Sequence, residues 1–159
     1  MIVRENEIGK SNIRLKKHDI ALASSMIDKM STTIDLLYYL IDRGEERSFV
    51  IMLISADDVD MQDIINSQKR DTDILFYLEH TGSLYALICQ DTKVDGAYMF
   101  AQRLVKKVQD EGANNIYCAE LEVKSAKHDI KYIIFRSIET YVDAVQNKKD
   151  SEIVFKTIN

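Results

Sequence analysis

The sequence has no long apolar segment and no leader-like N-terminus. Nowhere in its 159 residues does an apolar run reach the roughly 18 residues that a membrane-spanning helix needs. The opening stretch, MIVRENEIGK, carries acidic residues where a signal peptide has its apolar region. We therefore expect a cytoplasmic protein without direct membrane insertion.

Clustered positive charge is missing, and cysteine is scarce. The net charge is −5 and the lysines and arginines are spread along the chain, which argues against a nucleic-acid partner. The two cysteines, Cys89 and Cys118, lie in separate apolar runs without CxxC spacing. This pattern is typical of buried, reduced thiols, and it makes neither residue a good candidate nucleophile.

Proline is absent, so the five glycines alone mark the breaks between periodic segments. The length and the 46% apolar content suit one domain with one core. A long helix is predicted over 11–43, with Ser11 as its N-cap and Gly44 just beyond its end. Another helix is predicted over 93–111, with a capping box formed by Thr92 and Asp95 and an end at Gly112.

The remaining segments alternate between strand and helix patterns. Strands are predicted over 48–56, about 73–79, 84–90, 114–123 and 151–158, and further helices over 57–70 and 126–147. This order predicts an α/β (α+β) sandwich, with a mixed sheet of about five strands around a ferredoxin-like β-α-β-β-α-β unit and a long N-terminal helix before it.

From residue 47 onward the sequence resembles a known family. Arg70-Asp71-Thr72-Asp73 is followed by ILFYL and then by EHTGS at a hairpin turn. Downstream, LYALICQDTKVDGAYMFAQRL and HDIKYIIFRSIETYVDAV follow in the same order as in that family. Over roughly 110 residues the chain resembles a degenerate GGDEF domain, the diguanylate cyclase domain, which implies a nucleotidyl-cyclase-like fold. The resemblance divides the chain into an N-terminal helix over 1–44, a predicted coiled coil, and a GGDEF-like domain over 45–159.

The turn departs from the family pattern. Family cyclases hold two metal ions between an aspartate at the end of the first strand and a carboxylate of the turn. Asp57, Asp58 and Asp60 could supply the first carboxylate, but magnesium bound to a triphosphate needs oxygen ligands from both sides. In the turn, Thr81 and Gly82 stand at the two acidic places, within the set Glu79, His80, Thr81, Gly82 and Ser83. We therefore predict no catalytic residues, no metal, no cofactor and no cyclase activity.

The Arg-x-x-Asp motif offers a binding function instead. In the family this motif forms an inhibitory site for cyclic di-GMP, and the resemblance assigns the ligand contacts to Arg70 and Asp73. An arginine fork can pair with guanine O6 and N7, while a carboxylate accepts from the opposite edge of the base. The structural alternative is that Asp73 only caps the chain locally.

A heptad repeat in the first helix predicts a dimer. Isoleucines recur at intervals of seven with apolar residues between them, as in a coiled-coil seam. The alternative is that the last two turns of this helix pack on the domain itself, and Lys16 weakens the seam near its start. The predicted seam consists of Ile13, Ile20, Ile27, Met30, Ile34, Leu37 and Ile41.

Other enzyme classes lack support in the sequence. His18, His80 and His128 have no ligand-like spacing, and Ser83 has no G-x-S-x-G elbow. We predict a catalytically inactive regulatory protein, either a cyclic di-GMP receptor or a protein–protein scaffold without a nucleotide ligand. By resemblance, such domains act in cyclic di-GMP signalling and in control of exopolysaccharide secretion or biofilm formation.

Overall fold

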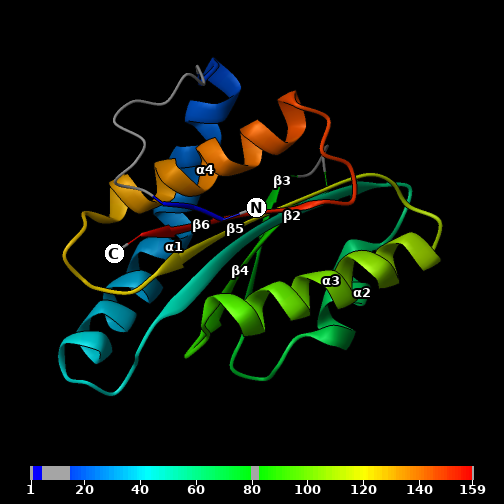
Figure 1. The fold of residues 1–159 in the computed structure, drawn as a ribbon. Helices are drawn as coiled ribbons and strands as arrows, with labels where there is room; N and C mark the ends of the chain where they lie inside the picture. Colours follow the sequence, from blue (N-terminus) through cyan, green and yellow to red (C-terminus); the bar gives the residue numbers. More distant parts are fainter. Residues whose placement is uncertain (1, 5–14, 80–82, 159) are drawn as a thin grey trace.

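The computed structural model describes residues 2–4, 15–79 and 83–158 and consists of helices on both faces of one sheet (Figure 1). Its helices are α1 (Lys17–Asp42), α2 (Met61–Gln68), α3 (Val94–Asp110) and α4 (Ile130–Gln146). Its strands are β1 (Ile2–Arg4), β2 (Phe49–Asp57), β3 (Ile74–Glu79), β4 (Leu84–Gln90), β5 (Asn114–Val123) and β6 (Ile153–Ile158). In the described ranges, no helix has the length and apolar content to cross a bilayer.

The sheet is mixed and has the order β1-β6-β5-β2-β4-β3. Strand β2 is antiparallel to both β4 and β5, whereas β6 is parallel to β5 and to β1. The predicted mixed sheet and the helix before it are confirmed. The sixth strand, β1, was not predicted, because three residues are too few to show an alternating pattern.

Strand β2 separates two apolar layers, which explains its unbroken apolar sequence. Phe49, Ile51 and Leu53 face the layer under α1 and α4, and the alternate residues face the layer under α3. Figure 1 shows α1 and α4 on one side of the sheet and α2 and α3 on the other. A strand that is covered on both faces has no side toward solvent, so nearly all of its residues are apolar.

The face of α1 that carries the heptad repeat packs on the protein's own sheet and on α4. Met30, Ile34 and Leu37 are buried in this core, so their assignment to a dimer seam is wrong. Ile27 and Ile41 are partly buried against the same core. Over a few turns, a seven-residue repeat drifts by only about 20° per heptad from the face of a straight helix, so the sequence could not separate the two arrangements.

The other end of the predicted seam is different. Ile20 is 55% exposed, and Ile13 lies outside the described residues. Because α1 shares its core with the strands, the predicted boundary after residue 44 falls in a turn within one folded unit.

The helix ends follow glycine as predicted, but the start of α3 does not follow the predicted capping box. Gly44 and Gly112 adopt φ values of 76° and 88°, the left-handed conformation that closes a helix. Helix α3 begins at Val94, whose N–H donates to the Glu122 carboxylate of β5 at 2.8 Å. A buried acid from the sheet thus caps this helix in place of Asp95.

Candidate functional site

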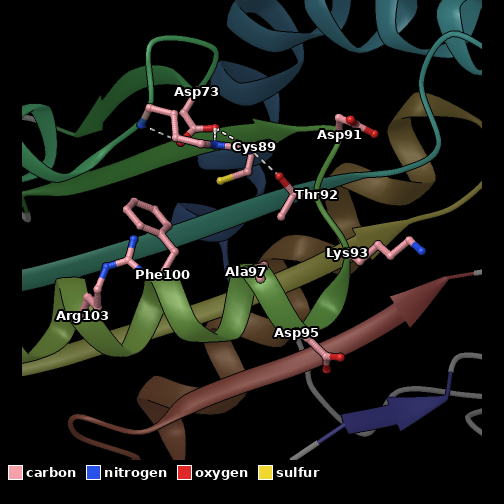
Figure 2. Close-up of a pocket in the computed structure, with 11 residues that line it drawn as sticks. Asp73, Cys89, Asp91, Thr92, Lys93, Asp95, Ala97, Phe100 and Arg103 are labelled. Atoms are coloured by element: carbon pink, nitrogen blue, oxygen red, sulfur yellow. Dashed lines mark hydrogen bonds and ion pairs between the residues drawn. The ribbon is translucent and has the colours of Figure 1, made fainter.

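A cavity of about 380 Å³ opens where the α2–β3 junction, the end of β4 and the start of α3 meet. Both residues of the Arg-x-x-Asp motif line it, and Figure 2 shows side chains from all three segments around it. Three basic and three acidic side chains lie in the wall, together with the ring of Phe100. The cavity is therefore balanced in charge and has one aromatic surface.

The guanidinium of Arg70 is held by the chain on one edge. Its Nη2 donates to Asp73 Oδ1 at 2.8 Å, to the carbonyl oxygen of Gln90 at 2.7 Å and to Thr92 Oγ1 at 2.6 Å. Its Nε donates to Asp73 Oδ1 at 3.1 Å. The hydrogen bond to Asp73 raises the pKa of Arg70, so the side chain keeps its positive charge.

Asp73 is committed to Arg70 and is not open to solvent. It is 3% exposed, and its Oδ2 also accepts the backbone N–H of Arg70 at 2.9 Å. The structure therefore brings the two predicted residues together, with the carboxylate fixing the position of the arginine.

The opposite edge of Arg70 faces outward. The side chain is 52% exposed. Among the described residues, none accepts a hydrogen bond from Nη1. This nitrogen can donate to a molecule in the cavity without breaking an internal bond.

The loop between β4 and α3 is clamped to the start of β2. The N–H of Thr92 donates to the Ser48 carbonyl at 3.1 Å, and Ser48 Oγ donates to the Thr92 carbonyl at 2.7 Å. The preceding Asp91 has a positive φ of 45°, which such a tight loop requires. These contacts fix Thr92 Oγ1 beneath Arg70.

Acidic groups surround Arg70. Glu46 is buried beside Asp91, and burial raises its pKa, an effect opposed by a backbone hydrogen bond from Asp91 and by the charge of Arg70. The positive charge of Arg70 is thus shared among several carboxylates, which reduces the field that it offers to an anionic ligand.

Helix α3 supplies the other wall. The guanidinium of Arg103 lies over the Phe100 ring, 5.6 Å from its centroid, and Figure 2 shows Phe100 extending toward the strand that carries Cys89. Sequence reasoning missed both residues, since Phe100 is what any amphipathic helix would bury. It also missed Ser48 and the carbonyl of Gln90, for which the sequence offers no signal.

The hairpin turn lies at the opposite end of the sheet. In the β2–β4 register, Phe49 pairs with Gln90 beside the cavity, and Ser55 pairs with Leu84 next to the turn. Six residues of strand separate the two places by about 20 Å. His80, Thr81 and Gly82 lie outside the described residues, between Glu79 at the end of β3 and Ser83.

The acids at the end of β2 have structural partners. Asp57 Oδ2 accepts from Asn115 Nδ2 at 2.9 Å, and Asp58 Oδ2 accepts from Asn114 Nδ2 at 3.0 Å. Asp60 caps α2 by accepting the N–H of Asp63. Asp57 and Asp58 therefore join β2 to the start of β5, and Asp60 caps a helix.

The remaining candidates stay apart from one another. His18 is exposed on α1, and His128 stacks on Tyr132 with ring centroids 5.2 Å apart. Cys89 and Cys118 are free and buried, as predicted, and burial raises the pKa of both thiols well above the usual value.

Comparison with known proteins identifies the fold. No family model and no curated protein matches the sequence. The active GGEEF domain of a diguanylate cyclase from Vibrio cholerae is 14% identical with a TM-score of 0.62, over 80% of this chain and 94% of that one. The GGDEF domain of DgcB from Caulobacter crescentus, in complex with c-di-GMP, is 8% identical with a TM-score of 0.64, over 80% and 88%. The FimX GGDEF domain from Pseudomonas aeruginosa is 13% identical with a TM-score of 0.51, over 81% and 92%. The chain thus has the GGDEF-domain fold, as its sequence predicted.

Proposed function

We propose that this chain is a regulatory domain without cyclase activity that binds cyclic di-GMP in the cavity at Arg70. The observation that carries the proposal is the position of Arg70, which internal hydrogen bonds hold in the cavity wall with Nη1 turned outward. A solved GGDEF domain of the same fold is a complex with this ligand, which supports the choice of ligand.

The chemistry of the cavity suits a guanine nucleotide. Guanine presents two adjacent acceptors, O6 and N7, to a guanidinium. Phe100 adds an apolar contact to the wall, although its ring is mostly buried and lies under Arg103. Arg103 and Lys93 lie in the same wall where phosphates would need cations. In this proposal Asp73 acts through Arg70, since its own carboxylate is covered.

The absence of cyclase activity rests on the sequence of the turn and on the β2 acids. In the turn, Thr81 and Gly82 provide no carboxylate that could bind a metal opposite the acids of β2. On the other side, the carboxylates of Asp57 and Asp58 are engaged by asparagine amides. Both features support a regulatory role over a catalytic one.

The second candidate is a protein–protein scaffold with no nucleotide ligand. A specific observation favours it: Nε and Nη2 of Arg70 already have partners within the chain. These internal contacts are enough to explain the Arg-x-x-Asp motif without a ligand. In either form, we propose a cytoplasmic role in cyclic di-GMP signalling, with exopolysaccharide secretion or biofilm formation as the output that the sequence resemblance implies.

Titration calorimetry with cyclic di-GMP tests the proposal. We expect binding by the wild type, and a loss of about 1.5–3 kcal/mol in Arg70→Ala, the usual contribution of hydrogen bonds to a charged group. Arg70→Lys should bind nearly as weakly, because the single nitrogen of an ammonium cannot replace the bonds to Asp73 and Thr92 and also present a second nitrogen to the ligand. Arg43→Ala, an exposed arginine outside the cavity wall, is the matched control and should bind normally.

Cyclic di-AMP serves as the control ligand, because adenine has a donor where guanine has O6. It should bind much more weakly than cyclic di-GMP. No heat with high micromolar cyclic di-GMP, or equal binding by wild type and Arg70→Ala, would leave the scaffold as the function to pursue.

A further inference from the structure

Glu120 is an acid in the interior of the sheet. It lies in the middle of β5, between Met52 of β2 and Phe155 of β6, and is 1% exposed. Its side chain shares a face of the strand with Cys118, which belongs to the apolar layer under α3. The proposed cyclic di-GMP site does not use it.

The carboxyl group of Glu120 has no hydrogen-bond partner. Neither of its oxygens accepts a hydrogen bond from any residue that the structure describes. Glu122, two residues along the same face and also 1% exposed, is different. Its oxygens accept from the Val94 N–H at 2.8 Å and from Thr157 Oγ1 at 3.1 Å. Glu122 Oε1 also lies 3.9 Å from Lys124 Nζ, so the two glutamates, at equal depth, differ in their hydrogen bonds and in their charged neighbour.

The surroundings of Glu120 offer no compensating charge. The titratable groups on this side of the sheet near it are the thiols of Cys89 and Cys118, which burial keeps neutral, and Glu122, a second acid that brings no positive charge. The neighbouring side chains of β2 and β6 are apolar, and so are those that α3 buries over this layer, which are Ala97, Phe100, Ala101, Leu104, Val105 and Val108. An ionised carboxylate would be very costly here, so the buried form is the neutral acid. Burial accordingly raises the pKa of Glu120 well above its usual value.

We propose that Glu120 makes the docking of α3 pH-dependent: α3 closes over the protonated acid, and ionisation of Glu120 loosens this helix from the sheet. Helix α3 is the element that moves, because it covers the face of β5 on which Glu120 lies. Its second and third turns carry Phe100 and Arg103, so loosening α3 would displace one wall of the cavity. The device is a property of the fold and does not require that cyclic di-GMP binds.

The sign of the pH dependence follows from proton binding. The folded state keeps the proton on Glu120 at a pH where the unfolded chain has released it. The stabilisation that comes from proton binding by Glu120 is therefore fully present below the ordinary glutamate pKa. It is lost as the pH rises through the raised pKa of Glu120 in the folded protein. Within this window, the folding equilibrium constant should fall tenfold for each pH unit.

Urea unfolding followed by circular dichroism tests the proposal at several pH values between about 5 and 8. Glu120→Gln keeps the shape and cannot ionise, so its stability should exceed that of the wild type by an amount that grows with pH. Glu122→Gln is the matched control: it loses a satisfied acid but retains Glu120, so its pH slope should equal that of the wild type. Parallel profiles for wild type and Glu120→Gln would overturn the proposal.

Infrared spectroscopy provides a second measurement that does not depend on how stable the variants are. The folded wild type near pH 6 should show the band of a buried protonated carboxyl, and Glu122→Gln should retain it. Glu120→Met, which has an apolar side chain of similar length, should lack this band. It takes the place of Glu120→Gln if that variant folds poorly. A wild type without this band, or a band that survives in Glu120→Met, would show that Glu120 is not the buried neutral acid.

Discussion

Replacing Asp73 with asparagine should destabilise the fold through Arg70. Each carboxylate oxygen accepts from this arginine: Oδ1 from Nη2 at 2.8 Å, and Oδ2 from the backbone N–H at 2.9 Å. Asparagine keeps one acceptor and turns the other into a donor, which then faces a donor of Arg70. The change is nearly isosteric, so its effect reports on charge and hydrogen bonding and not on packing.

The magnitude follows from the burial of the two partners. A hydrogen bond to a charged group contributes about 1.5–3 kcal/mol, and a donor left facing another donor in a buried site costs a similar amount. Arg70 is half-exposed, so solvent screening reduces the ionic part of this loss. We expect Asp73→Asn to lose about 2 kcal/mol of unfolding free energy, or roughly 4–8 °C in melting temperature for a chain of this size.

Circular dichroism during urea and thermal unfolding is the assay, since the chain has no tryptophan. Asp71→Asn is the control, because Asp71 is exposed in the same turn, and it should change stability by less than about 0.5 kcal/mol. In a double-mutant cycle, Arg70→Ala with Asp73→Asn should be less harmful than the sum of the single changes. If the two asparagine variants unfold alike, the bonding of Arg70 to Asp73 does not hold the fold.

Further predictions concern catalysis, assembly and the thiols. The protein should form no cyclic di-GMP from GTP with magnesium or manganese, and turnover that is lost in Asp57→Asn would contradict this. Ile34→Asp should cost more than about 4 kcal/mol, because it buries a charge in the core, whereas Ile20→Asp at an exposed site should cost under about 0.5 kcal/mol. Light scattering should give the same mass for Ile20→Asp and the wild type, and a smaller mass for the variant would restore a seam at the start of α1. Cys89 and Cys118 should react with a thiol reagent only as fast as the protein opens, and immediate labelling of the native protein would refute their burial.

The sequence predicted most of the fold because the elements that form it have strong periodicity. Strands β4 and β5 match their predicted ranges of 84–90 and 114–123, and every other predicted element is present with ends shifted by up to about six residues. What it could not predict was the side of α1 that faces the core. The isoleucine repeat is compatible with a coiled coil and with an ordinary amphipathic helix. The packing of α1 on α4 and on the sheet decides between these two arrangements.

The sequence predicted the local part of the site, but not the partners that come from distant segments. A local motif placed Arg70 and Asp73 within reach of each other, and the structure shows this contact. The other partners of Arg70 come from the end of β4, about 20 residues away, and are a carbonyl and a threonine hydroxyl. Such contacts depend on strand register and leave no pattern in the sequence, so the cavity could not be derived before the fold was known.

The internal bonds of Arg70 define what separates the two proposed functions. A scaffold needs the bonds to Asp73 and Thr92 only to hold the corner of the fold, and in that case every variant that breaks them changes stability alone. A receptor needs the same bonds to hold Nη1 in the cavity wall, so the variants change affinity as well. Asp73→Asn and Arg70→Ala therefore have to be compared in both assays. An affinity loss that exceeds the loss of folded protein identifies a receptor, since mass action on a partly unfolded population can explain no more than that loss.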